Sequence, residues 1–129
     1  MNKRGLADKS LWVLSVLVAL AFILSGVPKI AAMSDWILKF ADWGYSVWFM
    51  RLVGATEIAC GLLLLVPRSA PWAAGLLGLV MLGAAYTHLA RNEWSQFPRP
   101  LLFLLLLALI VRGRRKARAP GAAPLAERP

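Results

Sequence analysis

Four long apolar blocks, separated by shorter polar or aromatic stretches, dominate the hydrophobic pattern of the sequence. The apolar residues follow one another without the polar face that an amphipathic helix of a soluble protein shows. A helix rises about 1.5 Å per residue, so blocks of this length cover most of a hydrocarbon core of about 30 Å. We therefore predict an all-α fold, an integral membrane four-helix bundle. The predicted spans are residues 11–27, 50–66, 71–89 and 97–111.

The first block follows residues 1–10, which contain the basic residues Lys3, Arg4 and Lys9. A secretory signal peptide has the same layout, with positive charge before an apolar stretch. No small-x-small cleavage site follows the block, so we expect a retained membrane anchor that ends near Pro28. A cleaved signal peptide is the alternative.

The stretch over residues 31–49 mixes aromatic and charged residues and is not a span. Amphipathic aromatic side chains anchor proteins at membrane–water interfaces. We expect a loop or a short helix at the level of the lipid headgroups. Its aromatic and charged residues are Asp35, Trp36, Lys39, Asp42, Trp43, Tyr45 and Trp48.

The second and third blocks are joined by residues 67–71, Pro-Arg-Ser-Ala-Pro, which are too few for anything but a tight turn. The two blocks should therefore form a helical hairpin. Small residues allow helices in lipid to approach one another closely. The glycines that we expect at helix contacts are Gly26, Gly54, Gly61 and Gly78.

The fourth block has the shortest clean apolar core, residues 100–111. Either residues 94–99 extend it with a proline kink, or the side chain of Arg112 reaches up to the interface. Residues 112–129 mix Arg, Pro, Ala and Gly without apolar periodicity. We predict a disordered basic tail there.

The composition supports a membrane protein, because 60% of the 129 residues are hydrophobic and only 16% are charged. Soluble domains carry about a quarter charged residues. The net charge of +9 suggests nucleic acid in a soluble protein, but here the basic residues lie outside the apolar blocks. We expect the lipid bilayer, and no nucleic acid, as the partner. The single cysteine, Cys60, excludes an intramolecular disulfide, and no metal site is evident.

The distribution of positive charge predicts the orientation. With a cytoplasmic N-terminus, ten basic residues lie inside and five, namely Lys29, Lys39, Arg51, Arg91 and Arg99, lie outside. Excess Lys and Arg in short flanking segments marks the cytoplasmic side. We therefore expect both termini in the cytoplasm, in a multi-pass protein of the bacterial inner membrane.

Glu57 is the sharpest candidate for a functional residue, because it lies about two turns inside the second block. A charged side chain there costs about 2.5–3.5 kcal/mol on insertion scales. Gly54 and Gly61 flank it at helical spacing, so a neighbouring helix can come close to that face.

Lys29, Arg51 and His88 are the expected partners of Glu57, because all four residues fall in the outer half of the predicted bundle. Arg51 is about 120° around the same helix, which makes it a poor partner within that helix. Two interpretations stay open. The residues form an ion pair that fixes helix packing, or they form a ligand or redox site.

Three segments resemble the DoxX family of small four-span bacterial membrane proteins. They are residues 22–30 (FILSGVPKI), 51–68 (RLVGATEIACGLLLLVPR) and 73–88 (AAGLLGLVMLGAAYTH). The family is named for a subunit of a thiosulfate:quinone oxidoreductase, so the resemblance implies a membrane redox or quinone-linked role. It supplies no agreed catalytic residues, and the sequence shows no flavin motif or haem ligand pair.

Three functions remain in play. The first is an accessory or quinone-interacting subunit that works with a redox enzyme partner. The second is a non-enzymatic scaffold or assembly factor, which includes a homo-oligomer. The third is a small proton-coupled transporter that uses a membrane carboxylate. Whether the chain is an enzyme is left open by the sequence, and no cofactor other than a quinone is suggested.

Overall fold

The computed structural model describes residues 3–118, with side chains over residues 5–116, and the described residues form helices joined by short turns and loops, without strands. The all-α prediction is therefore confirmed. Its helices are α1 (Lys3–Ile30), α2 (Ser34–Asp42), α3 (Val47–Leu63), α4 (Ala70–Ala90) and α5 (Pro98–Arg118). The four longer helices coincide with the four apolar blocks, and α2 falls in the aromatic stretch between the first two.

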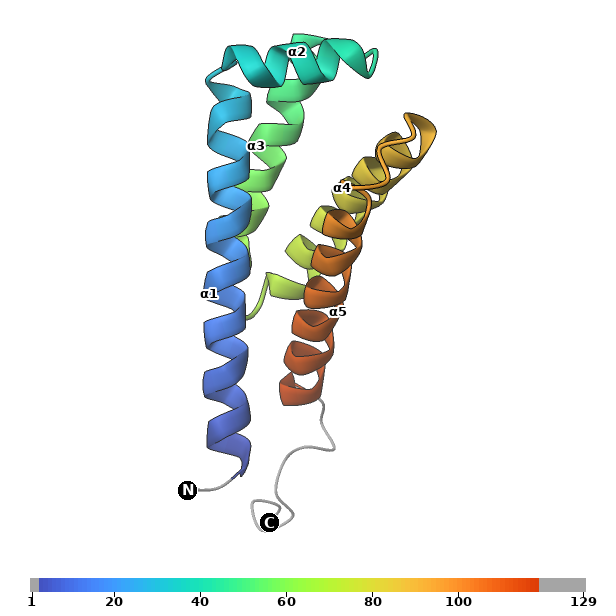
Figure 1. Cartoon of the computed structure of the whole chain (residues 1–129). Coiled ribbons are helices and arrows are strands. Elements are labelled where there is room, and N and C mark those ends of the chain that lie inside the picture. The colour runs from blue at the N-terminus through green and yellow to red at the C-terminus, as the bar shows by residue number, and fades with distance from the viewer. Residues whose placement is uncertain (1–2, 119–129) are drawn as a thin grey trace, which may run out of the picture.

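The helices form two hairpins that diverge toward one end (Figure 1). One pair consists of α1 and α3, which pack along each other, and the other consists of α4 and α5. The prediction that the second and third blocks form a hairpin is therefore wrong in its packing: a short turn joins α3 to α4, but each packs mainly against another helix. The short helix α2 lies across the ends of α1 and α3 (Figure 1). The start of α1 and the end of α5 both lie at the end of the bundle away from α2 (Figure 1). The chain therefore enters and leaves the described bundle on the same side. Which side faces the cytoplasm stays a prediction.

Helices α1 and α5 extend furthest beyond the predicted limits. Helix α1 begins at Lys3, although residue 11 was the expected start, and it passes through Pro28 to Ile30, although residue 27 was the expected end. A proline inside a membrane helix is tolerated because neighbouring groups satisfy the freed carbonyl. Helix α5 continues to Arg118, so the prediction that residues 112–118 are disordered is wrong. Arg, Lys and Ala are strong helix formers, so this segment can be helical without an apolar periodicity. The remainder of the predicted tail, residues 119–129, lies outside the described residues.

By length and composition, α1 (over Gly5–Ile30) and α4 are able to cross a membrane. Helices α2 and α3 together would make a third span, bent by 113° at the break between them. Helix α3 alone has only 17 residues, and α5 has basic residues near both ends. The four-span arrangement is therefore still a prediction, while two or three spans follow from the structure.

The hydrophobic core lies where the two hairpins meet, toward the end where α3 turns into α4. Its buried side chains come from all four long helices. Examples are Phe22 of α1, Leu64 after α3, Leu77 of α4 and Ile110 of α5. On the outside, large apolar side chains are widely exposed, such as Leu24 (71%) and Leu79 (64%). Lipid, rather than water, is the environment that suits such a surface.

Candidate functional site

The backbones of α1 and α3 touch where two glycines face each other. A Cβ atom added to Gly26 would lie 2.5 Å from the carbonyl oxygen of Gly54, and one added to Gly54 would lie 2.8 Å from that of Gly26. Gly61 repeats the contact further along, with 3.1 Å to the carbonyl oxygen of Ala19. The distances at Gly26 and Gly54 are shorter than a real Cβ atom can adopt, so only glycine permits the contact at these two positions.

Gly78 does not take part in such a contact. A Cβ atom there would meet only the Cδ2 atom of Leu104, at 3.8 Å, which is an ordinary van der Waals distance. The close approach that the sequence suggested at Gly78 is therefore not present. Helix α4 meets α5 through larger side chains at this position.

The glycine contact brings Lys29 of α1 against Glu57 of α3. The Lys29 Nζ donates a hydrogen bond to the Glu57 Oε1 at 2.5 Å and another to the hydroxyl of Ser25, one turn earlier, at 2.8 Å. Nζ also lies 4.6 Å from the centre of the Trp36 ring of α2. Glu57 is 1% and Lys29 7% exposed, so both charges are withdrawn from solvent and paired with each other.

Arg51 is placed apart from this pair. It lies on the exposed side of α3, near the beginning of the helix. Of the two cations proposed from sequence as partners of Glu57, the structure brings Lys29 to the carboxylate. The six-residue separation on one helix explains why Arg51 points elsewhere.

His88 belongs to a second polar cluster, at the end of α4. Its Nδ1 lies 2.7 Å from the Oε1 of Glu93, and the Trp43 Nε1 donates to both oxygens of the same carboxylate at 3.2 and 3.3 Å. The hydrogen bond from His88, and then that from Trp43, holds the pKa of Glu93 below its usual range. Arg91 donates to the carbonyl oxygen of Trp43 at 2.9 Å. These contacts join the loop after α4 to the loop after α2.

A third contact reinforces this connection. The hydroxyl of Thr87 donates to the carbonyl oxygen of Gly83, so it is available to accept a hydrogen bond from the Tyr45 hydroxyl, 2.8 Å away. The sequence did not single out Glu93 or Thr87, and it indicated Trp43 and Tyr45 only as aromatic residues at the membrane interface, not as site residues. For Glu93 and Thr87 the only sequence signal is that polar groups are concentrated near the predicted outer ends of the helices.

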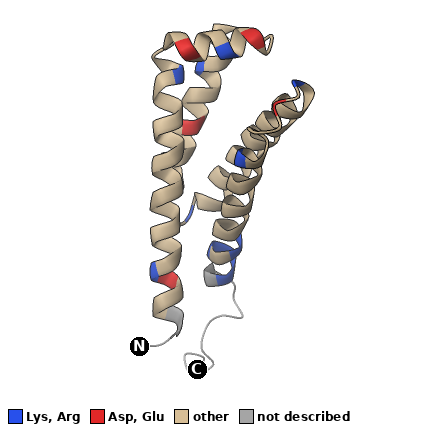
Figure 2. Ribbon diagram, viewed as in Figure 1, with Lys and Arg blue, Asp and Glu red and all other residues tan. Residues whose placement is uncertain are grey.

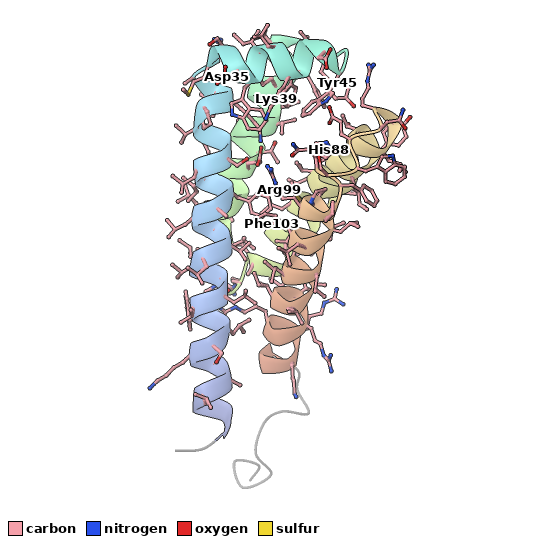
Figure 3. All side chains as sticks on the ribbon, viewed as in Figure 1. Asp35, Lys39, Tyr45, His88, Arg99 and Phe103 are labelled. Atoms are coloured by element: carbon pink, nitrogen blue, oxygen red, sulfur yellow. The ribbon has the colours of Figure 1, made fainter. Side chains whose placement is uncertain are left out.

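The Lys29–Glu57 pair and the His88–Glu93 cluster line one cavity of about 880 Å³. Figure 3 shows Lys39, Tyr45, His88, Arg99 and Phe103 around the space between the hairpins, below α2. The polar groups lie toward the α2 end, and apolar side chains form much of the remaining wall. Among the apolar lining residues are Phe22, Leu76, Leu79, Val80, Met81 and Phe103. The cavity thus brings together Lys29, Glu57 and His88, as expected from their common depth, and leaves out Arg51.

The protein-family model of the DoxX-like family matches residues 13–110, which run from within α1 to within α5. The chain belongs to the DoxX-like family. The resemblance drawn from sequence is thereby confirmed, and the match contains the whole lining of the cavity. A search of curated proteins finds no match.

As a DoxX-like protein with apolar helices, the chain is a membrane protein in contact with lipid. Among the described residues, no group of His, Cys, Asp and Glu is arranged to hold a metal ion. What the cavity offers is hydrogen bonding. Because Nδ1 of His88 is engaged by Glu93, its Nε2 is left for a second partner.

Proposed function

We propose that this DoxX-like protein binds the head group of a membrane quinone in the cavity, as an accessory subunit of a redox system in the bacterial inner membrane. One observation carries the proposal: a cavity of about 880 Å³ combines apolar walls with two hydrogen-bonded polar clusters at one end. Ligand sites for small molecules commonly measure about 300–1,000 Å³ and have few, well-placed polar groups in apolar surroundings.

A quinone suits a cavity that has a polar end and apolar walls. Its planar ring carries carbonyl oxygens that accept hydrogen bonds, and its isoprenoid tail is apolar. Lys29 and His88 are among the donors that line the cavity, together with Lys39, Tyr45 and Arg99, and the rings of Trp36 and Trp43 line it as well. The tail would lie against the apolar walls of the cavity. We therefore assign binding and orientation of the head group to this end of the cavity.

Reduction of a quinone to a quinol takes two electrons and two protons. In this proposal a partner enzyme supplies the electrons, because the chain has one cysteine and so no thiol pair that could supply them. The part of this protein is to hold the quinone where such a partner can reduce it. Transport coupled to Glu57 is less well supported, because that side chain is buried and paired with Lys29.

Purification in mild detergent followed by lipid extraction and mass spectrometry tests the proposal. A quinone should accompany the protein in near-stoichiometric amount. The Tyr45→Phe and His88→Ala variants should retain less of it, because the first loses a hydroxyl and the second an imidazole of the lining. The Asp8→Asn variant is the control, since Asp8 is exposed on α1 far from the cavity. A folded protein that carries no quinone would support a scaffold or assembly factor instead.

A further inference from the structure

The guanidinium group of Arg114 is buried at the opposite end of the bundle from the cavity, in the last turns of α5. Arg114 is 3% exposed, and its Nε and Nη2 atoms are buried without a hydrogen-bond partner among the residues that the structure describes. A buried donor that lacks a partner loses its hydration, and the loss is larger for a charged group than for a neutral one. The described residues therefore leave a positive charge without the acceptor that its burial requires.

The two unpartnered atoms form one edge of the guanidinium group. Nε–H and the adjacent Nη2–H point in parallel, which is the fork that binds two oxygens of a phosphate or a carboxylate at once. A chance surface arginine would leave its nitrogens to water. Here the edge that is suited to an oxyanion is the one that is buried and unsatisfied.

The surrounding side chains fix this group in place. A Cβ atom added to Gly113 would lie 2.8 Å from the Cδ1 of Leu11, so α5 rests against α1 at this level. The Cζ of Arg114 lies 4.7 Å from the centre of the Trp12 ring, within the range of a cation–π contact. The guanidinium is thus oriented before any ligand arrives.

A shallow apolar groove starts at the same tryptophan. It has a volume of about 250 Å³ and is lined by Trp12, Val13, Val16 and Leu17 along α1. A free inorganic anion would gain nothing from this groove, whereas an acyl chain would cover it. The groove therefore favours a ligand that has both an oxyanion and a hydrocarbon chain.

The charge at this end of the bundle favours a negative ligand. Figure 2 shows Lys and Arg concentrated toward the end of α5, and Arg112, Arg115 and Lys116 are exposed there. Basic residues near an anionic membrane surface contribute about 1 kcal/mol each. They attract anionic lipid without selecting one position, which leaves Arg114 as the group that recognises a phosphate.

We propose that Arg114 binds the phosphate of an anionic phospholipid, with one acyl chain of that lipid lying in the groove beside Trp12. The site is separate from the quinone cavity and does not depend on it. Both nitrogens are covered in this conformation, so the phosphate reaches them by displacing neighbouring side chains. The bound lipid would then satisfy the buried edge and tie the end of α5 to α1.

Native mass spectrometry of the full chain in detergent, titrated with phosphatidylglycerol, tests this site. The unsubstituted protein should retain one lipid molecule more tightly than the rest. Arg114→Gln should weaken that binding by about 10-fold or more, the effect of losing a charge-assisted hydrogen-bond pair. Arg115→Gln removes the same charge at an exposed position and should change the affinity much less. Equal losses in the two variants, or none in either, would overturn the proposal.

Two further experiments ask whether binding depends on the two parallel donors of Arg114 or only on its charge, and whether the ligand is a lipid or a free anion. Arg114→Lys keeps the charge but not the parallel donors, so it should also lose the tight lipid, and unaltered binding would refute the role of the fork. With the unsubstituted protein, phosphatidylglycerol should raise the melting temperature, while inorganic phosphate and phosphatidylcholine should not. Equal stabilisation by inorganic phosphate would assign the site to a free anion, and equal stabilisation by phosphatidylcholine would contradict the selectivity. The melting-temperature comparison uses only the unsubstituted protein, so it holds even if a variant fails to fold.

Discussion

Lys29 and Glu57 meet at 2.5 Å beside the point where Gly26 and Gly54 bring the backbones of α1 and α3 into contact. The two features depend on each other, because a Cβ on Gly54 would lie 2.8 Å from the Cβ of Lys29. The glycines set the helix separation, and that separation lets a short ion pair form between buried side chains.

Removing one partner of this pair should destabilise the protein strongly. Lys29→Met leaves a buried carboxylate without its cation, and Glu57→Leu leaves a buried ammonium without its anion, each costing about 3–5 kcal/mol. The double variant should recover much of the loss, since two apolar side chains replace the pair. Unfolding in mixed micelles of increasing denaturing detergent measures these differences. Arg51→Gln is the control, and its effect should stay within about 0.5 kcal/mol because Arg51 is exposed. Strictly additive effects in the double variant would show that the two residues are not coupled.

Alanine substitutions should separate the glycines that are needed from the one that is not. Gly26→Ala and Gly54→Ala each place a methyl group against a backbone oxygen that cannot turn aside, so both should lower the melting temperature. Gly78→Ala meets only ordinary contact distance. It should be neutral or stabilising by up to about 1 kcal/mol, because alanine favours helix over glycine. Three equal melting curves would contradict the close contact of α1 and α3.

The Glu93 cluster should make stability depend on pH on the acid side. The pKa of Glu93 is lowered in the folded protein, by its hydrogen bond from His88 and then by that from Trp43. A group with a lowered folded pKa stabilises the fold above its unfolded pKa, and this stabilisation is lost as the pH falls through the folded pKa. Glu93→Gln should therefore lower the melting temperature at neutral pH and have less effect at low pH. Asp35→Asn serves as the control, because it removes an exposed carboxyl group on α2. A loss of melting temperature in Glu93→Gln that does not vary with pH would contradict the proposed stabilisation by the Glu93 contacts.

Topology can be tested with reporters, independently of the site. The basic residues are divided ten to five between the two predicted sides, which favours cytoplasmic termini. A reporter that is active only outside the cytoplasm should be active when inserted near Asp42 and silent when fused after Arg118. The reversed pattern would place α2 and the polar end of the cavity on the cytoplasmic side.

Much of the fold could be predicted from the sequence, because apolar blocks of this length have few stable forms other than helices in lipid. The depth of Lys29, Glu57 and His88 was also accessible, since helical rise converts position into distance. The residues at which the helices begin and end were harder to predict. The extension of α5 to Arg118 follows from local helix propensity, which composition alone does not separate from disorder.

The partners within the site were harder to predict than its depth. His88 pairs with Glu93 through a turn of the chain after α4, and Trp43 joins them from a different loop. Such contacts depend on how two loops meet in space, which periodicity does not encode. Gly78 illustrates the same difficulty. It has the residue type that helix contacts favour, but the facing residues decide whether a close contact forms.

Quinone binding in the cavity is tested most directly by titrating the protein in nanodiscs with a short-chain quinone and following tryptophan fluorescence. Trp36 and Trp43 line the cavity, whereas Trp72 is 83% exposed on α4, so the first two report on the cavity and the third on the lipid-facing surface. We predict saturable quenching that is largely lost when Trp36 and Trp43 are both replaced by Phe and retained in Trp72→Phe. Quenching that does not saturate, or that is retained equally in the double variant and in Trp72→Phe, would contradict quinone binding in the cavity.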